Sequence, residues 1–497
     1  NAGDGAALTM TASSTNTTVN VAGVSLIDDL SITNQSTASI LTISSPISGN
    51  AAISVQGGPG VTLSGSNTFN GGVSLQGGTF KLGHKYALGT GALVINGGIL
   101  DVTGGLSISN NSPQFWNADF TFAGSGALNL GNGPVTLVDD RAVNVNANTL
   151  TVGGTIDDGA SSLSLTKDGA GRLLLAGTNT YGGGTVLNEG ELGINSAWSL
   201  GTGTLIINGG ALNNDGGRNL TNLNNNTQVW NGNFSWIARY SLVMGNGAVT
   251  LGGNVTITNP YSIYGNILTV GGTIDDGANS YRLTYGGVNG GLALAGANTY
   301  DGGTVLNGGK LYINHGQALG SGPLIINGGQ IDNYSGATVS NANNNAQFWN
   351  ADFSFYGHST LHLGTGAVTL GASLAVNNIN NSLSVSGSID DGANSYSLPK
   401  KGGGTLVLEG ENLYDGGTIL DAGALEIDHP GAIGSGLVTI NGGQVSCNGV
   451  GAISNANNNI QLWNGNFEHK GGKDLNLGVG AVTLARDCSV GSLWSTL

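Results

Sequence analysis

Short apolar runs, rich in β-branched residues and bounded by polar residues and glycine, recur along the whole chain. Examples are GALVING at 91–97, GTLIING at 203–209, GPLIING at 322–328 and GLVTING at 436–442. Runs of this kind, closed by Asn-Gly or Gly-Gly, are typical of short strands between tight turns. Apolar residues at helical spacing are missing, and glycine interrupts each candidate helix. The sequence therefore predicts an all-β protein.

The strands belong to a longer repeat that is copied along the chain. Its clearest landmark is an aromatic segment, and NGG and IDDGA recur at nearly the same interval. The aromatic segments are QFWNADF (114–120), QVWNGNF (228–234), QFWNADF (347–353) and QLWNGNF (461–467), which place a tryptophan every 114 to 119 residues. We predict these boundaries: the end of a preceding partial copy at 1–56, copy one at 57–165, copy two at 166–283, copy three at 284–398 and a truncated copy four at 399–497.

Two architectures fit copies of this length. Tandem β-sandwiches of about a hundred residues would require linkers between copies, but the strand pattern runs through 162–171 into the next copy without a Pro/Ser-rich tract. Coils of roughly 20–25 residues would instead give about five coils per copy. We therefore predict one continuous, elongated, right-handed parallel β-helix (β-solenoid) of about 20 coils, with all copies in the same solenoid.

Composition supports a folded chain and excludes some partners. Of 497 residues, 90 are glycine, 39% are hydrophobic and 9% are charged, with a net charge of −15. This apolar content argues against disorder, and the few scattered cations argue against nucleic acid or an anionic membrane as partner. No apolar run could span a bilayer, and no signal peptide is visible. Both termini fall inside a copy, so we expect a piece of a longer polypeptide. Cys447 and Cys488 are expected to be unpaired thiols.

Three glycine-rich segments carry a more specific pattern, which combines a G-x-L-x-L-x-G strand, an N-T-Y-x-G-G-T turn and an N-x-G-x-L strand. They lie at 166–192, 285–311 and 400–427, with a degenerate instance at 57–82. The pattern resembles the passenger-associated strand repeat of bacterial autotransporters. That resemblance implies an extracellular β-helix displayed on a Gram-negative-type cell surface. The chain differs from a full autotransporter in showing neither a signal sequence nor a C-terminal β-barrel, which leaves the secretion route open.

The recurrent aromatics are expected to be structural. In WNADFTF, period-two alternation puts Trp116 and Phe120 on one strand face, so we predict that they point into the core; exposed sugar-stacking rings are the alternative. The predicted core residues are Trp116, Phe120, Trp230, Phe234, Trp349, Phe353, Trp463 and Phe467. The predicted turn residues are Tyr181, Tyr300 and Tyr414, for which packing is favoured because the equivalent position holds Phe69.

Paired carboxylates are the only candidates for a cation site. They are Asp157, Asp158, Asp275, Asp276, Asp390 and Asp391, each pair followed by glycine. Asp-Gly favours tight turns, whereas calcium needs six or more converging oxygens, so a structural turn is the favoured interpretation and calcium the alternative. The asparagine runs 224–226, 343–345 and 457–459 suit sharp corners or, alternatively, a ledge for glycans. His84, His315 and His429 share one position but lie a copy or more apart, too far to form one site.

No clustered carboxylates, phosphate loop or nucleophile motif is visible, so we expect no catalytic residues and no cofactor. The main hypothesis is a non-catalytic, structural or adhesive β-helical rod, stalk or fibre of a bacterial cell surface. Its expected partners are further copies of itself, end to end or laterally, together with glycans or a host or neighbouring cell surface. A polysaccharide-binding or polysaccharide-cleaving β-helix is the alternative, and a cation-stiffened surface layer is a third hypothesis.

Overall fold

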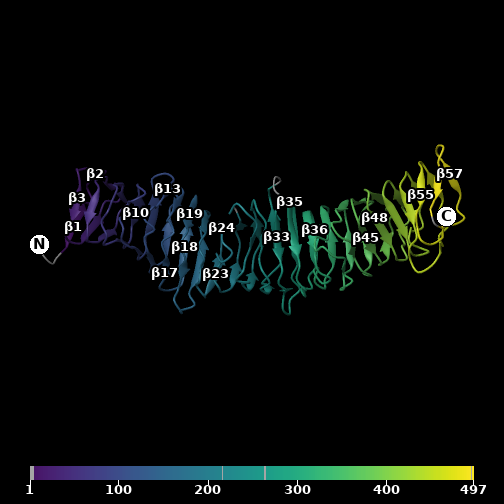
Figure 1. The fold of residues 1–497 in the computed structure, drawn as a ribbon, viewed down its shortest axis with the longest axis horizontal. Helices are drawn as coiled ribbons and strands as arrows, with labels where there is room; N and C mark the ends of the chain where they lie inside the picture. Colours follow the sequence, from purple (N-terminus) through teal and green to yellow (C-terminus); the bar gives the residue numbers. More distant parts are fainter. Residues whose placement is uncertain (1–4, 215, 262–264, 494) are drawn as a thin grey trace. The chain divides into compact units, whose positions relative to one another are not determined.

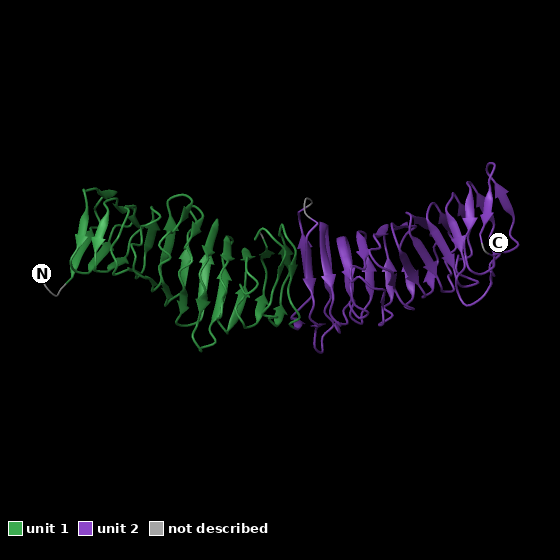
Figure 2. Cartoon of the chain, in the orientation of Figure 1, with its two compact units in different colours: residues 1–247 green, residues 248–497 purple. Residues whose placement is uncertain are grey.

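The computed structural model describes residues 5–214, 216–261, 265–493 and 495–497. These residues form two compact units, 1–247 and 248–497 (Figures 1 and 2). The described strands pair in parallel with strands of the preceding and following coils, so each unit is a β-solenoid; the chain has about 22 turns, and no helix occurs among the described residues. The predicted all-β parallel solenoid is therefore confirmed. Because the described residues contain no helix, none of them supplies a helical membrane span.

Three series of paired strands, one per face, build unit 1. The first face holds β1 (Ala6–Met10), β4 (Leu30–Asn34), β7 (Ile53–Gln56), β9 (Val73–Leu75), β11 (Leu93–Ile95), β14 (Gln114–Trp116), β17 (Val135–Leu137) and β20 (Ile156–Asp157). The second holds β2 (Thr17–Val19), β5 (Leu41–Ile43), β8 (Val61–Leu63), β10 (Thr79–Leu82), β12 (Ile99–Val102), β15 (Phe120–Phe122), β18 (Arg141–Val145), β21 (Ser164–Asp168), β23 (Gly184–Leu187), β25 (Leu205–Ile207) and β28 (Gln228–Trp230). The third holds β13 (Leu106–Ser107), β16 (Leu128–Asn129), β19 (Thr149–Val152), β22 (Arg172–Leu175), β24 (Glu191–Ile194), β26 (Ala211–Asn213) and β29 (Phe234–Trp236). The pairs β3 (Val24–Leu26) with β6 (Ile47–Gly49) and β27 (Leu220–Thr221) with β30 (Leu242–Val243) complete the unit.

Unit 2 is built in the same way. One series holds β32 (Val255–Asn259), β35 (Leu283–Leu294), β36 (Thr304–Ile313), β37 (Leu324–Ile326), β40 (Gln347–Trp349), β43 (Val368–Leu370) and β46 (Ile389–Asp390). The next begins with β33 (Ile267–Val270), shares the long strands β35 and β36, and continues through β38 (Gln330–Asp332), β41 (Phe353–Phe355), β44 (Val376–Asn378), β47 (Leu398–Lys401), β49 (Thr418–Leu420), β51 (Val438–Ile440), β54 (Gln461–Trp463) and β57 (Val482–Leu484). A third holds β39 (Val339–Ser340), β42 (Leu361–His362), β45 (Ser382–Val385), β48 (Thr405–Leu408), β50 (Ala424–Ile427), β52 (Gln444–Ser446), β55 (Phe467–His469) and β58 (Val490–Ser492). The pairs β31 (Val249–Leu251) with β34 (Ile274–Asp275) and β53 (Ile453–Ser454) with β56 (Leu475–Asn476) complete it.

The core follows from side-chain alternation combined with stacking of equivalent strand positions. Leu75, Ile95, Trp116 and Leu137 are successive register partners in unit 1, and all are fully or almost fully buried. The residue before each of them points outward. Since every inward position packs on the inward positions of the coils above and below, the core is a continuous axial stack within the unit.

Successive copies do not place equivalent residues on the same face. In unit 1, Trp116 of copy one lies in β14 on the first face, whereas Trp230 of copy two lies in β28 on the second. In unit 2, Trp349 lies in β40, and Trp463 lies in β54, which belongs to the series of the neighbouring strand β41. Within each unit, equivalent residues of successive copies therefore lie on neighbouring faces of the solenoid. The sequence analysis did not foresee this rotation about the axis.

Candidate functional site

The most regular polar feature of the solenoid is one buried asparagine in each glycine-rich corner. In copy two, Asn179 Oδ1 accepts the backbone N–H of Ile156 at 2.9 Å, and its Nδ2 donates to the carbonyl of Ser199 at 2.6 Å. These two partners lie in the coils on either side. The same pair of bonds is made by Asn67, Asn298 and Asn412, each no more than 3% exposed. Each side chain therefore connects three coils.

The corner tyrosines are packed as rings but also use their hydroxyls. Tyr181, Tyr300 and Tyr414 are fully buried. The Tyr181 hydroxyl lies 2.6 Å from Thr185 Oγ1, and the other two tyrosines make the same contact four residues on, at 2.5 and 2.6 Å. Burial raises the pKa of all three phenols well above the ordinary value. Copy one has Phe69 in place of the tyrosine and Val73 in place of the threonine, so both hydroxyls of the hydrogen bond are absent together.

A buried lysine fills the inside of the same coil in two copies. Lys167 Nζ donates to the carbonyls of Asp168, Gly169 and Glu189 at 2.9, 2.5 and 3.1 Å, and Lys400 Nζ likewise donates to three carbonyls. Burial lowers the pKa of both ammonium groups to about 8, although the charge of Glu189 opposes the shift at Lys167. Since the partners are carbonyls of the turn itself, these lysines hold the corner rather than an external ligand.

The structure places most of the recurrent aromatics inside. Trp116, Trp230 and Trp349 are fully buried, and each indole N–H donates to the glutamine two residues before it at 3.2 to 3.3 Å. Each ring meets the phenylalanine four residues later edge-on, with centroids 5.0 to 5.3 Å apart, so Phe120, Phe234 and Phe353 share this packing. Trp463 makes the same contacts with Gln461 and Phe467 but is only half-buried.

The asparagine runs form corners. Asn225, Asn344 and Asn458, at the centres of the three runs, have φ near +50°, and the carbonyl oxygen of each side chain accepts a backbone N–H of the following coil at 2.8 to 3.0 Å. Asn tolerates this left-handed backbone better than other non-glycine residues. Asn111 takes the same conformation in copy one, which the sequence analysis overlooked.

The paired carboxylates bind backbone N–H groups of their own turns. Asp157 accepts from the Gly159 N–H at 2.8 Å and from the Thr180 hydroxyl at 2.5 Å, and these bonds lower its pKa. Asp275 has the same two kinds of partner and the same direction of shift, and Asp390 accepts from the Gly392 N–H. Asp158 is buried and accepts the N–H groups of Leu163 and Gly182; Asp276 and Asp391 each accept from the residue five positions on. The carboxylates are therefore turned toward N–H donors.

Neither the paired carboxylates nor the histidines converge. In unit 2, Asp275 lies in β34 and Asp390 in β46, which belong to different series of strands. His315 and His429 accept N–H bonds within their own turns. Across the described ranges, no three His, Cys, Asp or Glu side chains gather closely enough to hold a metal ion. Both cysteines are unpaired in the structure, with Cys447 buried.

An acidic cluster beside β50 of unit 2, made of Glu426 in that strand, Asp428 after it and Glu409 after β48, was not foreseen. Burial and the neighbouring charges of Asp428 and Glu409 raise the pKa of Glu426 to about 7, while a hydrogen bond from Asn448 at 2.9 Å opposes this shift. Asp428 accepts the backbone N–H of Asn448 at 3.0 Å. A carboxyl group with a raised pKa next to a second carboxyl group is a pattern found in acid–base sites.

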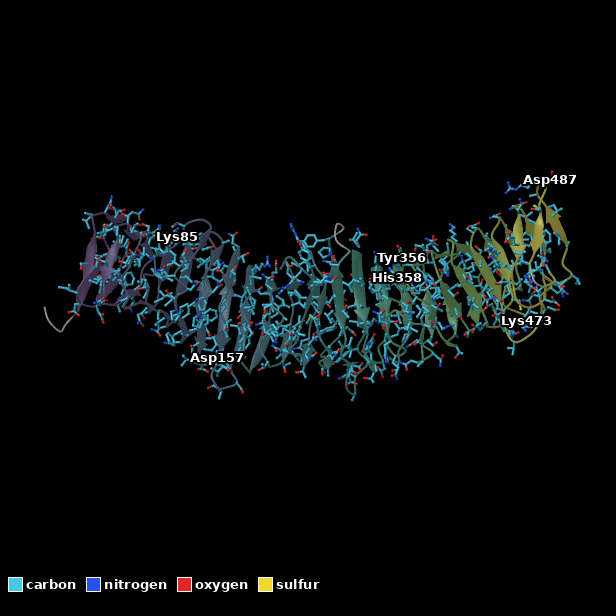
Figure 3. The ribbon with its side chains drawn as sticks, viewed as in Figure 1. Lys85, Asp157, Tyr356, His358, Lys473 and Asp487 are labelled. Atoms are coloured by element: carbon cyan, nitrogen blue, oxygen red, sulfur yellow. The ribbon has the colours of Figure 1, made fainter. Side chains whose placement is uncertain are left out.

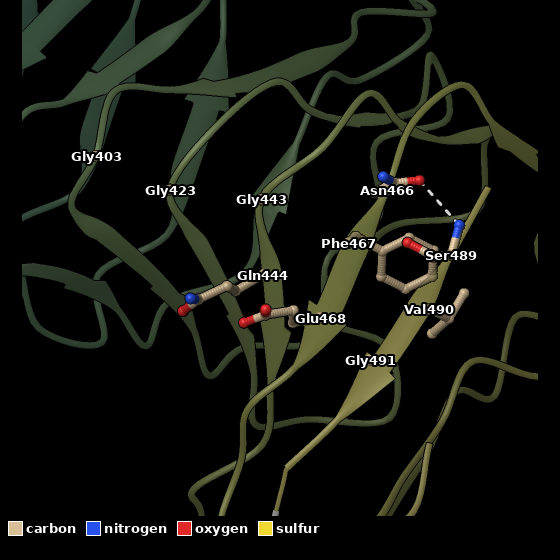
Figure 4. A pocket seen from close by; sticks show the side chains of 10 residues that line it. All are labelled: Gly403, Gly423, Gly443, Gln444, Asn466, Phe467, Glu468, Ser489, Val490 and Gly491. Carbon is tan, nitrogen blue, oxygen red and sulfur yellow. Dashed lines mark hydrogen bonds between the residues drawn. The ribbon is translucent and has the colours of Figure 1, made fainter.

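Unit 2 also has a hollow of about 630 Å³, shown in Figure 4. Gly403, Gly423 and Gly443 line one side, and Gln444 and Glu468 contribute polar side chains. A Cβ on Gly443 would come within 2.5 Å of the carbonyl oxygen of Gly423, so glycine is required there for the coils to stack. We interpret this hollow as a consequence of the glycine column.

With this geometry in place, comparison with known proteins identifies the corners. Residues 60–82, 165–194, 289–313 and 398–427 match the passenger-associated-transport-repeat family. The chain carries the repeat of autotransporter passengers. In the second match the repeat runs from β21 to β24, and Ser164 is the register partner of Gly184, so one passenger repeat forms one coil and begins the next. The buried asparagine lies in the turn of each repeat, followed two residues later by tyrosine in three repeats and by Phe69 in the first.

One curated relative shows extended similarity. The chain is 28% identical over 414 residues to a protein named Adhesin BmaC autotransporter, from Brucella suis biovar 1 (strain 1330). The match covers 79% of this chain and 10% of that protein, so the chain spans about a tenth of the relative's length. No solved structure matches the chain.

Proposed function

We propose that this chain is a non-catalytic, adhesive segment of an autotransporter passenger, displayed outside a bacterial cell. The observation that carries the proposal is the passenger repeat itself, whose polar residues are used to tie coil to coil: the corner asparagine binds the coils on both sides. Similarity to a protein named as an autotransporter adhesin supports the adhesive role. In this role the solenoid is a stalk that carries outward-facing residues at fixed positions.

The proposed partners follow from this architecture. Lateral or end-to-end association with further copies of the chain is part of the proposal. The other partners are glycans or the surface of a host or neighbouring cell. Sedimentation of the purified chain at increasing concentration tests association; a monomer throughout would contradict it.

Surface display provides the test of adhesion. The 497-residue chain would be joined to an outer-membrane anchor in a non-adherent bacterial host, and attachment to cultured epithelial cells and to neighbouring bacteria would be counted. We expect attachment above that of the anchor alone. Display of a folded, protease-resistant segment that leaves attachment unchanged would refute the adhesive role.

Polysaccharide cleavage is the second candidate, and Glu426 is the observation that favours it. A general acid with a pKa of about 7 beside Asp428 could protonate a leaving-group oxygen. Release of reducing ends from a panel of neutral and acidic polysaccharides would be measured for the native chain and for Glu426→Gln. Release that Glu426→Gln abolishes would support cleavage, and no release from any polysaccharide would exclude it in favour of adhesion.

A further inference from the structure

One set of outward positions differs in chemistry from copy to copy while the scaffold around it repeats. In copy one these positions hold Lys81, Asp101 and Ser125. Asp101 accepts from the Ser125 hydroxyl at 2.7 Å and pairs with Lys81 at 2.9 Å. Burial raises the pKa of Asp101, but these partners outweigh it and hold the pKa below its ordinary value. These three residues therefore form a small polar cluster in copy one.

Copy three keeps the aspartate but places a ring at each of the other two positions. Tyr312, Asp332 and His358 occupy the positions of Lys81, Asp101 and Ser125, judged from the flanking NGG and WNADF landmarks. Tyr334 and Tyr356 stand where copy one has Thr103 and Ala123. The sequence analysis did not single out any of these five residues, because their partners lie 20 or more residues apart and the coil length was needed to align them.

The five side chains of copy three form one cluster. Tyr312 meets Tyr334 edge-on with centroids 5.9 Å apart, and Tyr334 meets His358 edge-on at 4.6 Å. His358 in turn stacks on Tyr356, with centroids 4.6 Å apart and 28° between the rings. Tyr356 and His358 are labelled in Figure 3, within unit 2.

Asp332 fixes the orientation of the histidine. This carboxylate is fully buried, and its Oδ1 accepts the N–H groups of Asn333, Gly357 and His358 at 2.8 to 3.1 Å. Its Oδ2 lies 2.5 Å from Nδ1 of the His358 ring, which therefore donates to it. The ring is thus held at one nitrogen, and Nε2 is on the side away from Asp332.

The inner members of the cluster are buried, whereas the outer members face solvent. Tyr312 is 5% exposed, but Tyr334 and Tyr356 are 55% and 39% exposed, and the His358 side chain is 40% exposed. Folding does not require these outer rings, because copy one builds the same corner with threonine, alanine and serine. Large rings held rigid in water on a surface otherwise rich in Ser, Thr and Asn are characteristic of a recognition site.

We propose that Tyr334, Tyr356 and His358 form a platform that binds an uncharged pyranose unit of an oligosaccharide. One face of such a sugar presents weakly positive C–H groups that pack on the electron-rich face of an aromatic ring, while its rim of hydroxyls matches the two phenol hydroxyls and Nε2. Rigid rings lose little conformational entropy on binding. The net charge of −15 disfavours sulfated or sialylated glycans, so the site takes a neutral sugar.

This proposal rests on the proposed adhesive function and gives it a ligand class. The test uses the whole purified chain on an immobilised panel of neutral polysaccharides (glucan, mannan, galactan and N-acetylglucosamine oligomers), with heparin and oligolysine beside them. The variants are Tyr334→Thr, Tyr356→Ala and His358→Ser, each of which installs the copy-one residue and so preserves the corner. Phe348→Val is the matched control, because this 38%-exposed ring of unit 2 lies outside the cluster and copy two has Val229 there.

We expect at least one neutral polysaccharide to bind, and each platform variant to weaken binding about tenfold or more, the loss typical of an interface anchor. Phe348→Val should leave binding unchanged, and Tyr356→Phe, which keeps the ring, should retain most of it. Binding to no neutral polysaccharide, binding that survives all three variants, or platform-dependent binding of heparin or oligolysine would each overturn the proposal. If attachment of displaying cells persists in the variants, the adhesive function stands while this site is rejected.

Discussion

The buried corner asparagine offers the sharpest test of how the coils are held together. Asn298 in the third passenger repeat is 1% exposed, accepts the Ile274 N–H at 2.8 Å and donates to the Ala318 carbonyl at 2.6 Å. Asn298→Ala removes both bonds and leaves a buried N–H and a buried C=O without these partners. The change should therefore loosen the coils on both sides of the corner.

The expected size follows from the two orphaned groups. Each buried polar group that loses its partner costs about 1–3 kcal/mol, so the two together cost about 2–6 kcal/mol in the free energy of local opening. The lower end corresponds to a roughly 30-fold faster exchange of the affected amide. Asn327→Ala is the matched control. Asn327 also bonds to the coils on both sides, donating to Asn307 and accepting from Asn350, but it does so on the exposed surface, where water can replace the lost partners; that change should cost no more than about 0.5 kcal/mol.

Native-state hydrogen exchange read by mass spectrometry is the suitable assay, since a long solenoid need not unfold in one step. We expect faster exchange at Ile274 in Asn298→Ala, and little change in Asn327→Ala. The same substitution at Asn412, which binds Ile389 in the same way, should raise exchange there. Equal exchange at Ile274 in Asn298→Ala and Asn327→Ala would refute the view that these side chains tie the coils together.

Three further predictions concern charge. The raised pKa of Glu426 means that the folded chain binds a proton more tightly than the unfolded one, so stability from this group is present below about pH 4.5 and is lost as the pH rises through about 7. Glu426→Gln should therefore make the midpoint of urea unfolding depend less on pH over this window. The same pH dependence in Glu426→Gln and in the native chain would contradict the raised pKa. The lowered pKa of Lys167 works in the opposite direction, because the folded chain releases the proton first, so stability should rise from about pH 8 to about pH 10. Lys400 has the same lowered pKa, so Lys167→Met should reduce this rise and Lys167→Met combined with Lys400→Met should remove it, as followed by tryptophan fluorescence. Because the Asp157 carboxylate already accepts hydrogen bonds from Gly159 and Thr180, a chelator should leave the unfolding temperature unchanged. If a chelator instead lowers the unfolding temperature and added calcium restores it, the carboxylates bind a cation.

The sequence predicted the strand type because residue pattern and turn residues are local, and it predicted stacked coils because the copies follow one another without linkers. Alternation predicted that Trp116 and Phe120 point inward, as they do, but it put them on one strand, whereas they lie in β14 and β15. The hydroxyl contact of Tyr181 was missed because Phe69 made the hydroxyl seem dispensable; the matching replacement of Thr185 by Val73 four residues on was the signal that would have revealed it.

Contacts between coils were harder to predict, because they depend on coil length. Register partners are 19 residues apart at Arg172 and Glu191 but 28 apart at Val255 and Leu283. A variation of this size decides which side chains meet, so the pairing of His358 with Asp332 could not be derived from spacing alone. The rotation of the copies from face to face was unpredictable for the same reason.

That rotation has an evolutionary consequence. Duplicating a copy of this length moves the new surface sideways around the axis as well as along it, so two sister copies within a unit look in different directions. A partner with a flat binding surface cannot contact the equivalent residues of both copies at once. Selection at outward positions therefore acts on each copy separately. The aromatic residues of one copy and the small polar residues of another are what such independent drift and recruitment would produce on an otherwise invariant scaffold.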